Sequence, residues 1–335
     1  MPAAEPPLHP RDVYDLQGVD APEQAWLDAL ERGRMHHAWL LVGPEGVGKA
    51  SFAYRVARRL LGARPDPSHG LLGSDPEHPV SRQVAARSHP DLLVLERATD
   101  DGKPRKFIPV DDARRLPEFF SKAPAISPWR VAIIDAADDM NVNAANAVLK
   151  TLEEPPPRGV LLLVCHAPGR LLPTLRSRCR RLLFRPWEDE QVADFLLART
   201  ELAPEEARRL AGMARGAPGR ALTLAQAGAL EVDRVAHEVL RGLPQADESA
   251  LLSLAQGFRG AEGAARFELL FERMAEHVKL MIEETSGMAG AGRPEPWMDA
   301  WDNLIRIPVE AEAVNLDRQD AFWSAMAALR QAARS

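Results

Sequence analysis

The sequence is poor in cysteine and has no long apolar run. Its 335 residues include two cysteines, Cys165 and Cys179, too few for a disulfide framework and typical of a reducing compartment. No stretch approaches the roughly 20 apolar residues that a membrane-spanning helix needs. The amino-terminal stretch MPAAEPPLHPRD lacks the charged-then-apolar layout of a signal peptide. We therefore expect a cytoplasmic protein with no membrane partner.

Positive charge is also in deficit. Lys and Arg number 42 against 48 Asp and Glu, which gives a net charge of −6. A chain with this balance does not coat nucleic acid through bulk electrostatics, so any DNA contact would be local or supplied by partners. The length favours two or three domains, and 46% hydrophobic with 27% charged residues is an ordinary globular composition.

Short apolar runs alternate with amphipathic stretches in the first half, a pattern typical of a parallel α/β sheet. The predicted strands are Ala38–Val42, Leu92–Leu95, Val131–Asp135, Val160–Cys165 and Leu182–Phe184. The predicted helices are Lys49–Leu61, Asn143–Glu153, Ala265–Glu284 and Gln319–Ala333. After Pro186 the strand signal ends. We expect three domains: an α/β core over residues 1–186, a helical lid over 187–228 and a helical collar over 229–335.

A glycine-rich loop joins the first predicted strand to the first predicted helix. Residues 43–51 read GPEGVGKAS, in the strand–loop–helix context that a P-loop requires. Gly43, Gly46 and Gly48 would let backbone N–H groups curl round a phosphate, and Lys49 would add a positive charge. The spacing does not fit the dinucleotide-binding pattern G-x-G-x-x-G. The alternative interpretation is a tight strand-to-helix turn kept for packing.

Two groups that ATP hydrolysis needs are missing. Ala50 stands where a P-loop has the Ser or Thr that binds Mg²⁺, and the hydroxyl of Ser51 is rotated about 100° round the helix. Asp135 ends a buried strand as a Walker B acid does, but Ala136 follows in place of the water-activating Glu. Asp138 lies too far along to replace it. The alternative for Asp135 is a local strand cap. We expect a nucleotide pocket without hydrolytic activity.

With these residues in view, the chain resembles the delta-prime family of bacterial clamp-loader subunits, a branch of the AAA+ ATPases. The resemblance extends to about residue 225. It rests on the run AANAVLKTLEEPP over residues 144–156, on Ser177-Arg178-Cys179 and on the segment GAPGRA around Arg220. It implies an α/β P-loop NTPase core of the AAA+ type, a helical lid and a C-terminal helical collar.

The resemblance also implies roles for single residues. Arg178 would be an arginine finger, acting in trans on the ATP of a neighbouring subunit. If the resemblance is set aside, the default interpretation is that Arg178 belongs to a solvated basic loop. Arg220 would contact phosphate or brace the lid. We assign Glu153 and Glu154 to a charged helix end. Residues 62–88 contain no cysteine where many relatives carry a zinc module, so we expect no zinc, no other metal, and a loop or short helical excursion.

The expected function is that of a non-motor subunit that supports ATP-dependent loading of a sliding clamp onto primed DNA. Its partners would be the motor subunits and the delta subunit, with clamp and DNA reached through the complex. No cofactor is required. The degenerate pocket could hold ATP, ADP or phosphate weakly through Gly43, Gly46, Gly48, Lys49, Ser51, Asp135 and Arg220. The alternatives are an active motor ATPase and a P-loop kinase or regulator outside replication.

Overall fold

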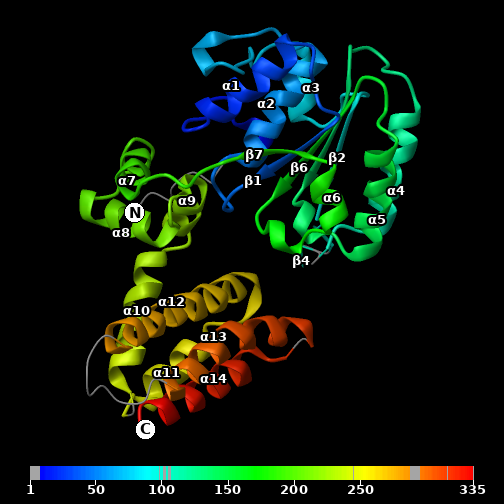
Figure 1. Ribbon diagram of the computed structural model, residues 1–335. Coiled ribbons are helices and arrows are strands. Elements are labelled where there is room, and N and C mark those ends of the chain that lie inside the picture. Colours follow the sequence, from blue (N-terminus) through cyan, green and yellow to red (C-terminus); the bar gives the residue numbers. More distant parts are fainter. Residues whose placement is uncertain are drawn as a thin grey trace. The chain divides into compact units, whose positions relative to one another are not determined.

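The computed structural model describes residues 8–334 except 98, 101–102, 105–106, 244, 287–294 and 315. The chain forms two compact units that divide between Leu222 and Thr223 (Figure 1). The first unit contains all the strands of the described chain, and the elements described in the second are helices. The predicted boundaries at 186/187 and 228/229 remain a prediction.

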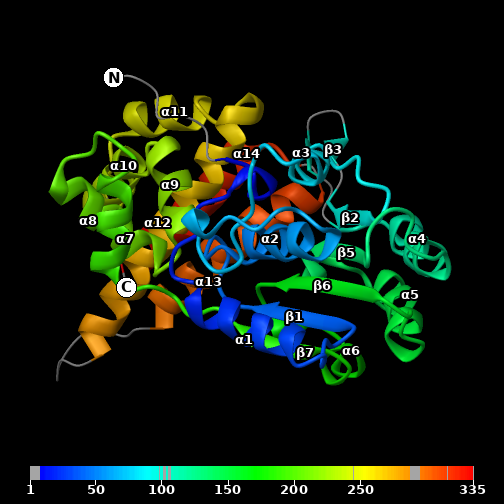
Figure 2. The same cartoon turned by 90° about the horizontal axis from the view of Figure 1, so that it is seen from above.

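The first unit is built on a five-stranded parallel sheet with the strand order β2-β5-β6-β1-β7. Its strands are β1 (Ala38–Val42), β2 (Leu92–Glu96), β5 (Arg130–Asp135), β6 (Gly159–Cys165) and β7 (Arg180–Leu183). β1 lies between β6 and β7, with Val42 opposite Cys165 and Leu183 (Figure 2). A separate antiparallel pair joins β3 (Thr99–Asp100) to β4 (Lys103–Pro104).

Helices cover both faces of this sheet. They are α1 (Asp20–Glu31), α2 (Lys49–Leu61), α3 (Pro79–Ala85), α4 (Val110–Ser121), α5 (Val142–Glu153) and α6 (Pro173–Ser177). Successive strand residues point to opposite faces, so Trp39 and Leu41 pack toward α1 and α2 while Ala38 and Leu40 pack toward α4, α5 and α6. Figure 1 shows these two groups of helices on opposite sides of the sheet. Burial on both faces explains why the strands read as continuous apolar runs.

The segment over residues 62–88 is ordered by ion pairs and short helices. It forms one turn of 3₁₀ helix (Pro67–His69) and then α3, and Arg64 pairs with Asp75 across its base. Leu72 donates its backbone N–H to the carboxylate of Glu23 over 3.2 Å. The expected short helical excursion is confirmed.

Three further helices follow the sheet: α7 (Asp189–Leu197), α8 (Pro204–Ala214) and α9 (Pro218–Gln226). α7 and α8 pack on each other, and a side chain of the first turn accepts the N-cap N–H in both, Gln191 from Glu188 over 3.1 Å and Glu206 from Ala203 over 2.9 Å. α9 crosses the division between the two units.

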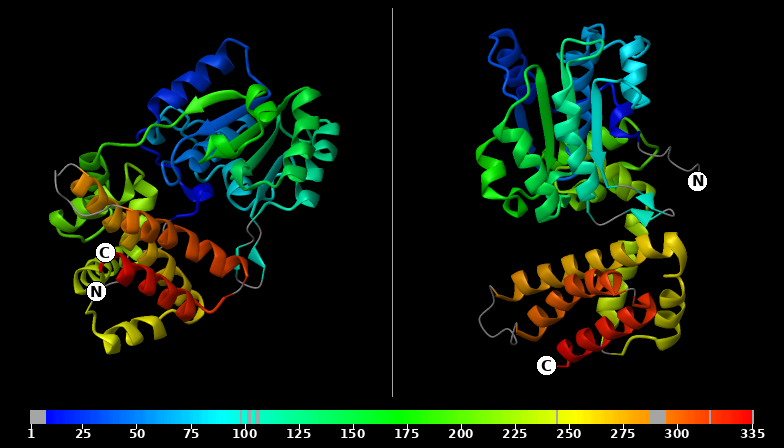
Figure 3. Two further views of the ribbon diagram at one scale, coloured as in Figure 1. Left: turned by 60° about the horizontal axis from the view of Figure 1, so that its bottom comes forward. Right: turned by 90° about the vertical axis from the view of Figure 1, so that its right-hand side faces the viewer.

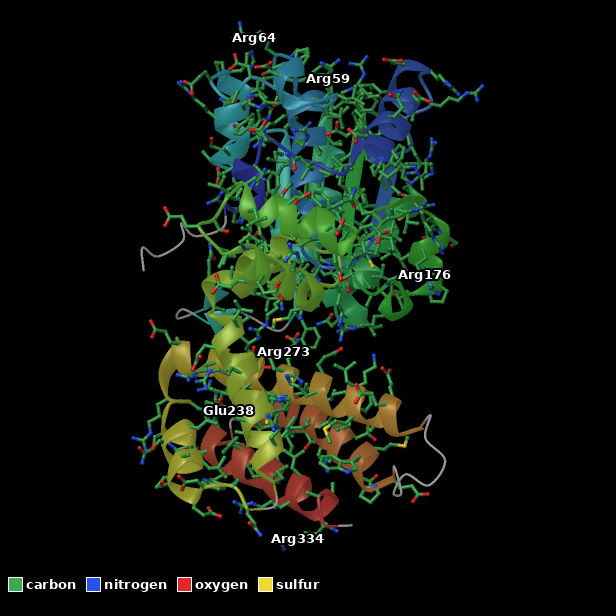
Figure 4. The ribbon with its side chains drawn as sticks, turned by 90° about the vertical axis from the view of Figure 1, so that its left-hand side faces the viewer. Arg59, Arg64, Arg176, Glu238, Arg273 and Arg334 are labelled. Carbon is green, nitrogen blue, oxygen red and sulfur yellow. The ribbon has the colours of Figure 1, made fainter. Side chains whose placement is uncertain are left out.

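The second unit contains α10 (Ala229–Gly242), α11 (Glu248–Gln256), α12 (Gly260–Ser286), α13 (Glu295–Ala313) and α14 (Arg318–Ala332). α12, α13 and α14 lie side by side (Figure 3). Phe258, between α11 and α12, is buried and packs edge-on to Phe267 and Phe322. α10 and α12 are joined by a buried ion pair, in which Arg273, labelled in Figure 4, donates to Asp233 over 2.8 Å.

The predicted fold class, α/β with a P-loop, a parallel sheet and helical parts after it, is confirmed. The ranges predicted for β1 and α2 agree with the structure, while the last strand begins at Arg180 rather than Leu182. Within the described residues, no helix is both long and apolar enough to span a membrane.

Candidate functional site

The glycine-rich loop turns the chain from β1 into α2. Gly46 (φ 80°) and Gly48 (φ 98°) adopt left-handed backbone conformations that favour glycine. Gly43 is required for a different reason, because a Cβ there would lie 2.4 Å from the carbonyl oxygen of Phe184. The loop therefore has the strand–loop–helix shape that the sequence predicts.

The ammonium group of Lys49 is bonded to this loop itself. Its Nζ donates to the carbonyl oxygens of Gly43 (2.7 Å) and Pro44 (2.5 Å), and the residue is only 2% exposed. Burial lowers the pKa of Lys49 to about 8, although Asp135 and other acidic groups oppose the shift. The charge expected to grip a phosphate is thus engaged by backbone carbonyls.

Two other segments cover the loop. The N–H of Gly219 donates to the carbonyl of Gly46 over 2.8 Å, and a Cβ on Gly46 would lie 2.5 Å from the backbone N of Arg220. A Cβ on Gly48 would lie 2.9 Å from Cδ1 of Leu16. The first turn of α9 and the segment before α1 therefore both contact the phosphate loop.

The Walker B-like carboxylate is that of Asp135. It ends β5 and stands opposite Glu96 in the register of β2. Burial raises the pKa of Asp135 to about 6, and Glu96 adds to the rise while Lys49 opposes it. Ala50 supplies no hydroxyl, and Ser51, on the next position of α2, is buried.

The acids that follow Asp135 are engaged in structural contacts. Ala136 is buried, and the carboxylate of Asp138 accepts the backbone N–H groups of His166 (3.0 Å) and Ala167 (2.8 Å). Burial acts to raise the pKa of Asp138, but these two donors hold it below its usual value. Asp139 pairs with Arg97 over 3.1 Å. Asp138 thus fixes the end of β6, a role that the sequence did not reveal.

Arg178 lies at the end of α6, a helix that carries Arg176, labelled in Figure 4. Its Nη1 donates to the carbonyl of Thr174 and its Nη2 pairs with Glu153, both over 3.0 Å. The side chain remains 38% exposed. Arg178 therefore contacts α5 and α6, and part of its side chain remains accessible to solvent.

The structure brings together Lys49 and Asp135, and it places the backbone of Arg220 on Gly46. Sequence reasoning missed Leu16, and it named Asp138 and Glu153 without predicting the contacts that they make. Leu16 stands outside any motif, so no sequence pattern identifies it. The one sequence signal for Glu153 was its position near the end of a predicted helix. Among the described residues, no group of three or more His, Cys, Asp or Glu side chains could hold a metal ion.

These residues fit a magnesium nucleotide poorly. Lys49 is bonded to loop carbonyls, a hydroxyl ligand is missing at Ala50, and the first turn of α9 contacts the loop at Gly46. What the loop retains is a set of backbone N–H groups at the start of α2.

Comparison with known proteins gives a consistent picture. Residues 20–188 match the family model described as DNA polymerase III, delta subunit. The DNA polymerase III subunit delta' of Pseudomonas aeruginosa is 40% identical over 168 residues, which cover 50% of this chain and 47% of that protein. The DNA polymerase III subunit tau of Escherichia coli is 30% identical over 287 residues, 82% of this chain and 42% of that protein. The chain spans about half the length of the curated relatives it matches.

Among solved structures, a DNA polymerase III gamma subunit-related protein from Thermotoga maritima is similar at 20% identity. The match covers 92% of this chain and all of that one, at a TM-score of 0.45.

Proposed function

The chain belongs to the DNA polymerase III, delta subunit family, and from this premise we propose that it is a non-motor subunit of a bacterial replication clamp loader. In this role it supports loading of a sliding clamp onto primed DNA without hydrolysing ATP. Its partners are motor subunits and a delta subunit, and it reaches clamp and DNA through the complex. We place the complex in the cytoplasm.

The observation that carries this proposal is the absence of two groups that ATP hydrolysis needs. Hydrolysis needs a metal-binding hydroxyl and a water-activating acid, and this chain has Ala50 and Ala136 at those positions. A subunit with this pocket contributes to the complex as a partner rather than as a motor.

Arg178 supplies the second part of the proposal. It is partly exposed and permanently charged, and it lies in the Ser-Arg-Cys segment that resembles the arginine-finger loop of clamp loaders. We propose that its guanidinium stabilises the charge that develops on the phosphates of ATP bound to a neighbouring motor subunit. This chain would thus act on hydrolysis in a site that it does not itself contain.

One observation favours a second candidate, an active motor subunit. The match to the tau subunit of Escherichia coli extends over 82% of this chain, whereas the match to the delta' subunit of Pseudomonas aeruginosa covers 50%. A motor needs its own hydrolytic groups, and Ala50 and Ala136 disfavour that role.

The proposal is tested by assembly and by turnover. The tagged chain is expected to emerge in a stoichiometric complex with motor subunits when they are co-expressed. The isolated chain is expected to show no ATP turnover with Mg²⁺ above that of Lys49→Ala. Turnover that Lys49→Ala abolishes would establish the motor candidate instead.

A further inference from the structure

Glu153 makes a contact whose geometry suggests more than a charged helix end. Its Oε1 lies 3.0 Å from Nη2 of Arg178, while Nη1 of the same guanidinium donates to the carbonyl of Thr174. The ion pair and the hydrogen bond hold two different nitrogen atoms of the guanidinium, one toward α5 and one toward α6, and this restricts its rotation. Within the described residues these are the two side-chain contacts of Arg178, and its side chain is 38% exposed.

The position of Glu153 in α5 is costly for the helix. It is the last residue of α5, where the helix dipole favours cations and disfavours a carboxylate. α5 packs against α6, and Figures 1 and 2 draw both helices on the same side of the sheet. The approach of Arg178 from α6 offsets that cost, and the pair joins two segments 25 residues apart in the chain.

We propose that Glu153 is a positioning residue for Arg178, which it holds in the orientation needed to reach a phosphate of the neighbouring subunit's ATP. This inference rests on the proposed function, since it gives the arginine finger a support within its own subunit. An arginine finger acts by placing positive charge where negative charge develops in the transition state. An arginine that samples many rotamers is less effective, because it occupies that position for less of the time. Glu153 reduces that sampling before the two subunits meet.

Exposed ion pairs are weak, which sets the size of the expected effect. The side chains of Arg178 and Glu153 are 38% and 52% exposed, so solvent screens their attraction. We expect Glu153→Gln to lower the Arg178-dependent part of ATP turnover by about 2- to 5-fold. That part is the turnover of the wild-type complex minus the turnover of the Arg178→Ala complex.

Glu154 provides a matched control. It is the next residue, it is exposed, and its side chain forms no ion pair with the described residues. Glu154→Gln removes the same charge one position further on and is expected to leave turnover unchanged. Thermal melting and co-purification of each variant with the motor subunits would verify folding and assembly.

The experiment measures the DNA-stimulated ATPase activity of the reconstituted loader with clamp and primed DNA. The variants compared with wild type are Glu153→Gln, Glu154→Gln, Arg178→Ala and the double variant Glu153→Gln/Arg178→Ala. Positioning predicts a lower kcat with an unchanged KM for ATP, because the contact is used in the transition state. It also predicts that Glu153→Gln has no further effect once Arg178 is absent.

The outcomes separate this inference from the proposed function. If Arg178→Ala lowers turnover and Glu153→Gln leaves it unchanged or raises it, the positioning role is wrong and the arginine finger stands. An equal loss from Glu153→Gln with and without Arg178 would also overturn it, since Glu153 would then act elsewhere. If Arg178→Ala has no effect, the finger itself fails and Glu153 has nothing to position.

Discussion

The backbone N–H of Gly219 donates to the carbonyl of Gly46 over 2.8 Å, so the first turn of α9 is joined directly to the phosphate loop. The same approach brings the backbone N of Arg220 to 2.5 Å from the place where a Cβ of residue 46 would lie. The loop and the first turn of α9 therefore pack as one piece, and a side chain at position 46 would force them apart.

This contact predicts the cost of Gly46→Ala. An alanine there adopts a strained left-handed backbone and also collides with the backbone of α9, so we expect a loss of about 2–4 kcal/mol. Gly62→Ala is the matched control, since Gly62 has φ 95° and open space around it, and we expect about 1 kcal/mol there. Urea unfolding followed by tryptophan fluorescence measures both. Equal losses of stability in Gly46→Ala and Gly62→Ala would show that the contact with α9 contributes nothing to the cost of Gly46→Ala.

Nucleotide binding by the isolated chain is expected to be weak and independent of magnesium. Ala50 removes a metal ligand, and Lys49 must leave two carbonyls before it can bind a phosphate. Calorimetry with ATP in the presence and absence of Mg²⁺ measures this, and Lys49→Met should abolish whatever binding occurs. A tightening of about tenfold or more on adding Mg²⁺ would contradict it, because such coupling requires a metal held by protein and phosphate together.

Arg178→Ala is expected to leave the chain folded and to lower the ATPase activity of the assembled loader. An arginine finger changes turnover at its own site by about 10³-fold or more, so the complex loses essentially the whole share carried by that site. Arg181→Ala, which removes an exposed charge from the neighbouring strand β7, is the control. Equal losses from both variants would indicate a general effect of positive charge rather than a finger.

The sequence predicted the parts of this site that depend on local pattern. A strand, three glycines and an amphipathic helix define the phosphate loop within a few residues, and the predicted bounds of β1 and α2 agree with the structure. The edge strand β7 was placed too late because its first two residues, Arg180 and Arg181, are exposed and give no apolar signal. α4, which has Pro117 in its interior, was not among the predicted helices.

Contacts between distant segments could not be predicted in this way. Asp138 bonds to backbone groups 28 and 29 residues further on, and Leu16 meets Gly48 from the segment before α1. Periodicity reports which face of an element is buried but not which distant residue lies against it. The pairing of Glu153 with Arg178 is of the same kind, so the sequence marked both residues without joining them.

Asp91 gives a pH-dependent prediction outside the nucleotide pocket. Its fully buried carboxylate accepts backbone N–H groups from Ala125, Ile126 and Ser127 and a bond from Nε of Arg130. Burial alone would raise its pKa, but these donors lower the pKa of Asp91 to about 2 from an ordinary value of 3.8. Asp91, which immediately precedes β2, therefore holds the segment that leads into β5.

Because the folded pKa of Asp91 lies below the unfolded one, its ionised form stabilises the fold above about pH 4, and this contribution is lost as the pH falls through about 2. We expect Asp91→Asn to cost about 2 kcal/mol at pH 7 and progressively less below pH 4. Urea midpoints of variant and wild type, compared at pH 7, 4 and 3, measure this. Asp194→Asn, at an exposed position of α7, should show no such trend. A difference between Asp91→Asn and wild type that stays constant over this range would mean that the bonds to Asp91 do not depend on its charge.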